Sequence, residues 1–270
     1  MRLGIVQHSL GTGRDPLAAI ARAKELGVES LALSLGPAVD DAALLATIGE
    51  EAAKAGLALE TGWGDRYITN GAAQTVEAFV SFVRTCCKPL GITVIGTASG
   101  SDRWRRDPPL AEQLDSMVAA LTPLAQAAAS EGVLLALENH ADYRGHEVAS
   151  IIHRVNSQGL RARLDTGNAY AVMEEPEVAT AALAPYTVAT HIKDLFVRPK
   201  HQGLLSLVGC GIGEGDVDVA ACVALLAAQA PDPAKLVLCL EIEPPHGTDL
   251  WPLAQQSVAW VREHLAAYLT

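Results

Sequence analysis

The chain lacks the sequence features of several large protein classes. Its five cysteines are an odd number without a Cys-x-x-Cys pair, so neither a disulfide framework nor a thiolate zinc site is indicated. No apolar run approaches the roughly 20 residues that a membrane-spanning helix needs. The first residues, Met1 to Val6, already have the composition of a strand rather than of a secretory leader. We therefore expect a soluble, cytoplasmic protein with reduced thiols and no membrane partner.

Basic side chains are also in short supply. The chain has 20 Lys and Arg against 31 Asp and Glu, which gives a formal net charge of −11. Because nucleic-acid affinity comes largely from Lys and Arg that neutralise phosphates, this balance opposes a nucleic-acid partner. A small molecule is the expected partner.

No linker, low-complexity tract or run of like charges divides the 270 residues, half of which are hydrophobic. Short apolar runs alternate with longer Ala- and Leu-rich segments, as in parallel strands joined by helices. We count eight such units. Strands are expected at Leu3–Ser9, Ser30–Leu35, Ala58–Gly62, Thr93–Ala98, Leu134–Glu138, Ala162–Asp165, Val188–Ile192 and Leu236–Glu241. Helices are expected at Pro16–Leu26, Asp40–Ala55, Ala72–Leu90, Leu110–Ser130, Glu147–Asn156, Glu177–Leu183, Val217–Gln229 and Leu250–Tyr268.

Glycines mark the repeated connection between a helix and the next strand. Gly27, Gly56, Gly91 and Gly132 each follow a helical segment, where a helix end favours a left-handed residue. An open doubly wound sheet is the main alternative fold, but no Gly-x-Gly-x-x-Gly follows the first strand. Eight units without that motif favour closure into a barrel. We predict a single α/β domain over residues 1–270, a (β/α)₈ TIM barrel.

Acidic residues and one histidine end four successive strands. In such a barrel the catalytic groups sit at the C-terminal ends of the strands. The fifth to eighth strands end in Glu138, Asp165, His191 and Glu241. Adjacent strands lie about 4.8 Å apart, so these side chains can converge on one ion. Three carboxylates and an imidazole favour Mn²⁺, Mg²⁺ or Co²⁺ over a structural zinc. The alternative is that each is a solvated loop residue or a helix cap.

The motifs around these residues resemble the xylose isomerase-like superfamily, also called the sugar phosphate isomerase/epimerase superfamily. The resemblance rests on Glu138-Asn-His140, Asp165-Thr-Gly-Asn168, His191-Ile-Lys193-Asp and Leu-Glu241, and it covers nearly the whole chain. It implies that the four strand-end residues bind one divalent ion, which holds vicinal oxygens of a keto sugar or a related acid. Related barrels are often dimers or tetramers, so a homo-oligomer is a further implication.

The metal set favours chemistry at a carbon next to a carbonyl. An ion that polarises the carbonyl stabilises an enediolate, and acid–base groups are then needed beside that carbon. Glu138 and Glu241 could remove and return the proton, which predicts an isomerase or epimerase of a keto sugar or sugar-acid derivative. The superfamily's ketose 3-epimerases have a similar pair of glutamates. They also have a His where this chain has Asn168 and an Arg where it has Val197, so a simple free-ketose epimerase is in doubt.

A lyase on the same scaffold is the competing hypothesis. Glu138-Asn-His140 and His191-Ile-Lys193 also resemble metal-dependent 3-dehydroshikimate dehydratases, in which His140 would be the base and Lys193 would polarise the carbonyl or assist the leaving hydroxyl. A keto-acid decarboxylase belongs to the same alternative. An endonuclease IV-like repair enzyme would need more clustered histidines, and a binding protein without catalysis would not need two carboxylates beside one ion.

Several further residues are candidates for substrate contact. They are His8, Glu60 and Trp63 near the first and third strands, Asn168 after the sixth, Arg103 in the basic loop 103–106, Arg198 beside Lys200, and His246 after the eighth. Each is as readily explained by packing or by exposure to solvent. Arginines suit bidentate binding of carboxylate or phosphate, so we expect an anionic substrate. The glycine-rich segment 209–215 lies where barrels often bind phosphate, although glycine alone does not establish such a site.

Overall fold

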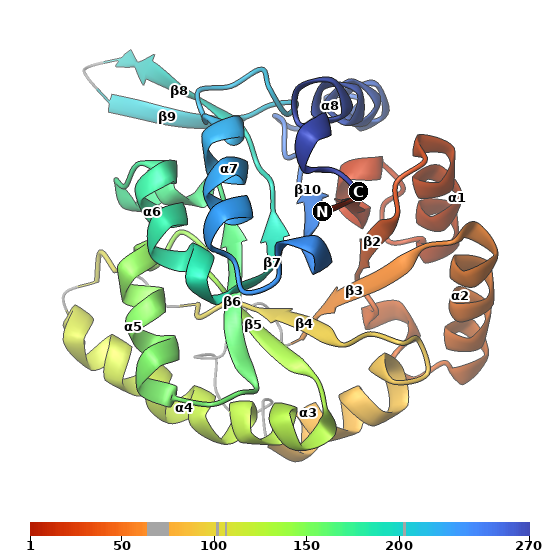
Figure 1. Ribbon diagram of the computed structural model, residues 1–270, viewed down its shortest axis with the longest axis horizontal. Helices are drawn as coiled ribbons and strands as arrows, with labels where there is room; N and C mark the ends of the chain where they lie inside the picture. The colour runs from red at the N-terminus through yellow and green to blue at the C-terminus, as the bar shows by residue number, and fades with distance from the viewer. Residues whose placement is uncertain (64–75, 101–102, 106, 202–203) are drawn as a thin grey trace.

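The eight strands that form the barrel follow the predicted order. The computed structural model describes residues 1–63, 76–100, 103–105, 107–201 and 204–270. Its parallel strands surround one centre, with helices on the outside (Figure 1). The strands are β1 (Arg2–Val6), β2 (Ser30–Leu33), β3 (Ala58–Gly62), β4 (Val94–Thr97), β5 (Leu134–Glu138), β6 (Leu160–Asp165), β7 (Thr187–His191) and β10 (Val237–Leu240).

The sheet closes on itself through one short seam. Its order is β10-β1-β2-β3-β4-β5-β6-β7, so β7 and β10 are the two strands left to meet. The amide of Ile192 donates to the carbonyl of Cys239 at 2.8 Å, and the amide of Glu241 donates to the carbonyl of Ile192 at 2.9 Å. These bonds draw together the strand ends that bear His191 and Glu241. The predicted TIM barrel is confirmed.

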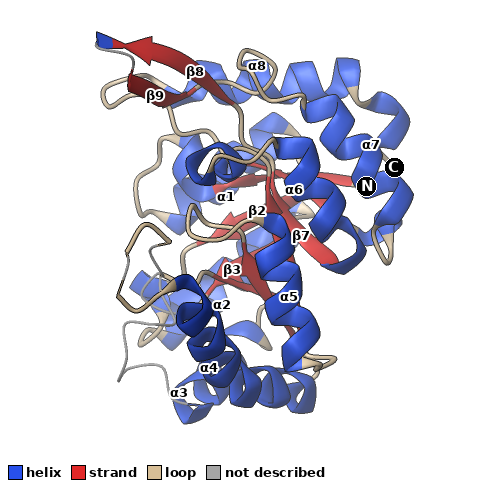
Figure 2. Cartoon of the chain, turned by 90° about the vertical axis from the view of Figure 1, so that its left-hand side faces the viewer, coloured by secondary structure: helices blue, strands red, loops and turns tan. Residues whose placement is uncertain are grey.

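Helices alternate with the strands and cover the outside of the barrel (Figure 2). Aspartates begin α1, α2, α7 and α8 by accepting backbone N–H groups, as helix N-caps do. Gly27, Gly56 and Gly132 end helices with φ near +70°, which confirms their predicted role. No helix in the described ranges is both long and apolar enough to span a bilayer. The bounds are α1 (Pro16–Leu26), α2 (Ala42–Ala55), α3 (Val76–Phe82), α4 (Leu110–Glu131), α5 (Gly145–Val155), α6 (Pro176–Leu183), α7 (Val219–Gln229) and α8 (Leu250–His264).

One predicted helix is described only in part. Residues 72–75 of the segment predicted from Ala72 to Leu90 lie outside the described ranges. The rest forms α3, followed by a π-helical stretch at Val83–Cys87.

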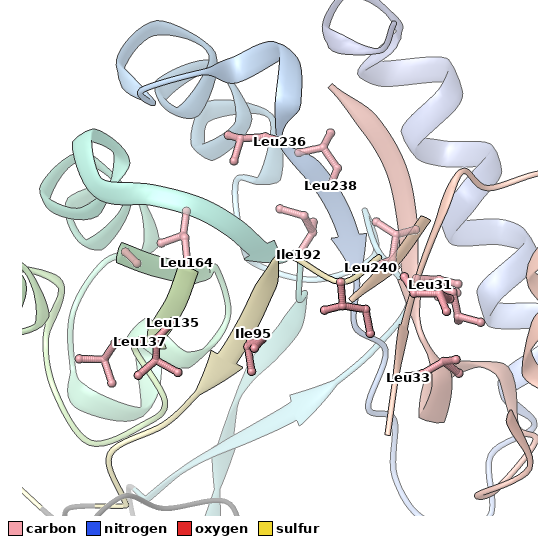
Figure 3. Packing of buried hydrophobic residues seen from close by; sticks show 14 of the residues in the cluster. Leu31, Leu33, Ile95, Leu135, Leu137, Leu164, Ile192, Leu236, Leu238 and Leu240 are labelled. Atoms are coloured by element: carbon pink, nitrogen blue, oxygen red, sulfur yellow. The ribbon is translucent and has the colours of Figure 1, made fainter. Parts of the chain in front are cut away.

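The core and the barrel interior differ in side-chain size. Leucines and isoleucines of the strands, among them Leu31, Leu135 and Leu238, pack with helix residues in one large cluster (Figure 3). Inside the barrel, Ala32, Val237 and Cys239 form a small separate cluster without helix residues. The large side chains therefore stabilise the layer between sheet and helices, and the interior is left with room for polar groups.

An antiparallel hairpin stands outside the barrel after β7. Its strands β8 (Leu195–Lys200) and β9 (Leu204–Gly209) pair only with each other, and it projects at the top of Figure 1. The sequence analysis predicted no strand between Val188–Ile192 and Leu236–Glu241, so it missed this hairpin. Arg198, Pro199 and Lys200 give the first stretch a loop-like composition, whereas its partner strand satisfies its backbone groups.

Two glycines offer a test of the packing. A Cβ at Gly159 would lie 2.1 Å from the carbonyl oxygen of Ala125 in α4, whereas a Cβ at Gly56 would meet nothing within 4 Å. We expect Gly159→Ala to lower the free energy of unfolding by about 3 kcal/mol, at the upper end of overpacking effects. Gly56→Ala, the matched control, should cost about 1–2 kcal/mol through its left-handed backbone alone. Urea unfolding of both variants checks this, and equal losses would contradict the packing described.

Candidate metal centre

The four predicted ligands lie at the C-terminal mouth of the barrel. Glu138, Asp165 and His191 end β5, β6 and β7, and Glu241 directly follows β10. All four are buried, with exposed fractions between 0 and 8 %. Because these strands are neighbours around the barrel, residues far apart in the sequence share one small volume.

The side chains converge closely. Glu138, Asp165 and His191 each present a ligand atom within 4.8 Å of the others. His191 Nδ1 lies 3.4 Å from an oxygen of Glu138 and 3.4 Å from an oxygen of Glu241. All four side chains therefore meet around His191, as a shared cation would require.

Backbone and amide groups fix the orientation of Asp165. Its Oδ1 accepts the N–H groups of Gly167 at 2.8 Å and Asn168 at 2.9 Å. The side chain of Asn139 donates to the Asp165 carbonyl and accepts from the Asp165 amide, each at 2.8 Å. Asn139 thus ties the end of β5 to the end of β6, which sets Glu138 beside Asp165 and leaves Oδ2 for the cluster.

An internal cation already lies among these carboxylates. Lys193 Nζ is 3.2 Å from Asp165, 2.7 Å from Glu241 and 2.9 Å from Glu243. Lys193 is itself only 7 % exposed, so it has left water to make these contacts. Burial of like charges is costly without a cation, and Lys193 supplies part of that compensation.

The pKa values reflect the same competition between burial and charge. Burial favours neutral His191, but Glu241 and Glu138 outweigh it and raise the His191 pKa to about 10. Burial raises the pKa of Asp165 to about 7 although Lys193 opposes it. Burial also disfavours ionised Glu241, yet His191 and Lys193 hold its pKa well below the usual range. The cluster holds protons that a metal ion would displace.

The donor set fits a hard divalent cation. Asp165 Oδ2, His191 Nδ1 and Glu241 Oε2 are enclosed within one small volume. Carboxylate oxygens and an imidazole nitrogen aimed at one volume are the donors that a hard divalent cation takes. The ammonium of Lys193 beside two of them shows that the volume attracts positive charge.

A cavity of about 780 Å³ opens beside the cluster. His191 and Glu241 form one wall, and the ends of β1, β2 and β3 form the other. His8 lies in this cavity with its Nε2 3.5 Å from Glu241. Asn168 donates to Glu138 at 3.2 Å. The structure therefore brings two of the predicted substrate contacts to the cluster.

Other predicted contacts lie elsewhere. Glu60 faces a separate cavity of about 590 Å³ that Arg2 and Lys235 also line, towards the N-terminal ends of the strands. Trp63 packs edge-on against Phe79, with 5.0 Å between the ring centroids, which is a core contact.

Two of the predicted arginines already have carboxylate partners. Arg103 pairs with Glu147 at 2.6 Å. Arg198 pairs with Asp216 at 3.1 Å and lies over the ring of Phe196. Arg106, of the same basic loop as Arg103, lies outside the described residues. Binding of an anionic substrate by these arginines stays a prediction.

The two remaining candidate histidines lie outside the cluster. His246 is exposed in the loop after β10. His140 is half-buried after β5. Its nearest described effect is on Asp142: burial raises the pKa of Asp142 to about 6, while a hydrogen bond from Ser99 and the charge of His140 lower it. A catalytic role for His140 stays a prediction.

The glycine-rich segment 209–215 has an internal acceptor. Asp194 Oδ2 accepts the amides of Gly213 and Gly215, each at 2.9 Å. These amides therefore stabilise the loop and are not free for a phosphate.

The sequence analysis missed three residues of the centre. Asn139 and Glu243 contact it as described above, and Arg163 reaches Glu138 at 3.7 Å from inside the barrel. The signal was present for Arg163, which lies two residues before Asp165 and so shares its side of β6. Glu243 lies two residues after Glu241, beyond the end of β10. Asn139 carried no such signal, because its partner is the backbone of another strand.

Residues 20–264 match the family model described as xylose isomerase-like TIM barrel. The chain belongs to this family. A curated relative is the uncharacterized protein YihM of Escherichia coli, 30% identical over 86 residues, a stretch that covers 32% of this chain and 26% of that protein. The chain thus matches only about a quarter of that relative's length.

Solved structures of the family share the fold. An IolI protein with a bound zinc atom has a TM-score of 0.78 at 17% identity, with 100% of both chains covered. A xylose isomerase-like barrel from Mycobacterium smegmatis with magnesium has a TM-score of 0.76 at 16% identity, covering 100% of this chain and 98% of that one. An L-ribulose 3-epimerase has a TM-score of 0.75 at 20% identity, covering 99% and 95%.

Asn139 provides a test of how the centre is positioned. We expect Asn139→Ala to weaken Mn²⁺ binding about 10- to 100-fold, the usual effect of losing a group that orients metal ligands. The reason is the loss of both hydrogen bonds between β5 and β6. Asn156→Ala, at an exposed helix end, is the matched control and should leave Mn²⁺ affinity unchanged. Calorimetric titration measures both, and unaltered affinity in Asn139→Ala would contradict this role.

Lys193 provides a second test, because its ammonium competes with an added cation. We expect Lys193→Met to bind Mn²⁺ at least about tenfold more tightly than the unsubstituted protein, since a positive charge leaves the cluster. Lys235→Met, which removes an exposed ammonium outside the mouth, is the control. Weaker Mn²⁺ binding in Lys193→Met would show that the ammonium supports the ion instead of competing with it.

Proposed function

We propose that this protein is a divalent-metal-dependent isomerase or epimerase of a keto sugar or sugar-acid derivative. The observation that carries the proposal is the placement of Glu138 and Glu241, each with an oxygen 3.4 Å from His191 Nδ1. They stand at the two ends of the arc β5-β6-β7-β10 and so approach one volume from different sides. Membership of the family and likeness to an L-ribulose 3-epimerase support this class of reaction.

Several residues take part in the proposed transfer of one proton. A bound divalent ion would polarise the substrate carbonyl and acidify the neighbouring C–H bond. One of Glu138 and Glu241, as an ionised carboxylate, would take up that proton, and the other, once protonated, would supply a proton to the opposite face. Asn168 at 3.2 Å orients Glu138, and Lys193 at 2.7 Å holds Glu241 ionised. Proton return to the same carbon inverts it, and return to the adjacent carbon completes an isomerisation.

The ligand set also bears on which ion is used. Three carboxylates and one imidazole favour Mn²⁺, Mg²⁺ or Co²⁺, and Glu138, Asp165, His191 and Glu241 are the proposed ligands. Magnesium and zinc in two similar structures support a divalent ion. Five free, buried cysteines are compatible with a cytoplasmic enzyme, which is part of the proposal.

Lys193 favours a lyase as the second candidate. Its ammonium lies within the cluster, 2.7 Å from Glu241, where it could protonate a departing hydroxyl or polarise a second carbonyl. A dehydratase or decarboxylase would begin with the same proton removal or charge stabilisation and then break a carbon–oxygen or carbon–carbon bond.

Proton NMR in D₂O distinguishes the two reactions. With Mn²⁺ and a panel of keto sugars and keto acids, an isomerase or epimerase places solvent deuterium on the substrate without loss of atoms. Glu241→Gln should lower kcat by about 10²- to 10⁴-fold, with Lys193→Ala milder, whereas a lyase should be at least as sensitive to Lys193→Ala. Exposed Glu263→Gln and Lys235→Ala are the matched controls.

Metal analysis can reject the proposed metal centre. Protein purified without chelator and supplied with Mn²⁺, Mg²⁺ or Co²⁺ should hold one ion per chain, and Glu138→Gln or Asp165→Asn should hold less while still folded. If elemental analysis finds no stoichiometric metal in the unsubstituted protein, the proposed metal centre is rejected. Small, equal effects of Glu241→Gln and Lys193→Ala would reject both mechanisms.

A further inference from the structure

A buried arginine beneath the metal centre has no role in the proton transfer described above. Arg163 points into the barrel from β6 and is only 6 % exposed. It belongs to the lining of the 780 Å³ cavity, together with His191 and Glu241. Its guanidinium therefore forms part of the floor on which a substrate would rest.

The barrel is built to accommodate this guanidinium. A Cβ at Gly96 of β4 would lie 2.0 Å from Arg163 Cζ, so the group packs directly against the Gly96 backbone. Ala32 and Cys239, small residues inside the barrel, leave further space. A leucine or isoleucine, the usual filler of barrel interiors, would pack this space more cheaply than a charge.

The hydrogen-bonding capacity of Arg163 is largely unused. Its Nε has no partner among the described residues. Its ion-pair partner Glu138 lies 3.7 Å away, beyond hydrogen-bonding distance. A guanidinium has five N–H donors, and burying them without acceptors is costly. The donors that face the cavity are therefore available to a ligand oxygen.

A second arginine lies at the rim of the same cavity. Arg14 follows the turn after β1, is exposed, and lines the cavity beside the ends of β1 and β2. Unlike Arg103 and Arg198, it has no carboxylate partner within the described part of the chain. Among the described lining residues Glu241 is the one carboxylate, and it belongs to the metal centre. Glu138 and Glu60 act on Arg163 from outside this lining, so the cavity itself presents the two guanidinium groups of Arg163 and Arg14.

We propose that Arg163 at the floor and Arg14 at the rim form an oxyanion subsite for the distal end of the substrate. This inference rests on the proposed function and names the substrate class: a keto sugar that ends in a carboxylate or a phosphate ester. The keto end lies at the metal centre, and the anionic end lies over β1–β3. Local arginines overcome the long-range repulsion that the net charge of −11 imposes on an anion.

Three ketoses that differ only at C6 test the subsite. D-Fructose, D-fructuronate and D-fructose 6-phosphate share the keto end and carry a hydroxymethyl, a carboxylate or a phosphate ester at the other. Calorimetry on the Mn²⁺-loaded protein should show at least one of the two anions binding about 10- to 150-fold more tightly than fructose. The anion that gains more identifies the group the subsite takes.

Variants separate this role from a merely structural one. Arg163→Gln should remove most of the preference for the anion over fructose, and Arg14→Ala, at an exposed position, should lower it about two- to fivefold. Gly96→Ala keeps the positive charge but displaces the guanidinium, and should also reduce the preference. Arg154→Ala, whose partner is Asp115, is the control and should leave the preference intact. Circular dichroism confirms folding of each variant.

The outcomes distinguish this proposal from the proposed function. Equal affinities for the three ketoses, no detectable anion binding, or an unchanged preference in Arg163→Gln and Arg14→Ala would overturn the subsite. A structural role for Arg163 would instead weaken Mn²⁺ and all three ketoses alike. An arginine-dependent preference without turnover of any ketose would leave the subsite standing and reject the proposed reaction. If no Mn²⁺ binds, the same affinity ratios measured on the metal-free protein decide the subsite alone.

Discussion

Everything at the mouth of the barrel depends on the contact between Lys193 and the buried carboxylates of Asp165 and Glu241. Without a cation, these acids and Glu138 would repel one another in a space from which water is largely excluded. Lys193 and His191 supply positive charge from β7 and the segment just after it, so the folded protein can hold the acids together before any ion arrives. The ligand geometry is thus prepared by the chain itself.

This preparation has consequences for how the site works. A divalent ion bound there would share the carboxylates with Lys193 and compete with the proton of His191, whose pKa Glu241 and Glu138 raise. Lys193 therefore balances part of the negative charge of the buried acids.

The sequence predicted the barrel and the convergence of four strand-end side chains because their signals are local. Apolar runs that end in Glu138, Asp165, His191 or Glu241 identify strand ends, and neighbouring strands bring those ends together. The contact between Arg163 and Gly96 joins strands β6 and β4, which are far apart in the sequence. Neither residue therefore indicated this contact from the sequence alone. Glu60 lies at the middle of β3 and not at its end, because the depth of a side chain within the barrel depends on strand stagger, which composition does not record. The hairpin β8–β9 was missed because each strand is stabilised by the other rather than by the core.

The close packing of Arg163 on Gly96 limits how this chain can change over time. A side chain at position 96 displaces the guanidinium, and a small residue at position 163 leaves a hollow above the Gly96 backbone. Neither step is neutral when taken first, so the two positions are expected to be exchanged as a pair or kept as a pair. Homologues that share Glu138, Asp165, His191 and Glu241 but have a bulkier residue at position 96 would then form a distinct branch. Their cavity floor would carry a different charge, and they would differ in their preference for an anionic over a neutral substrate.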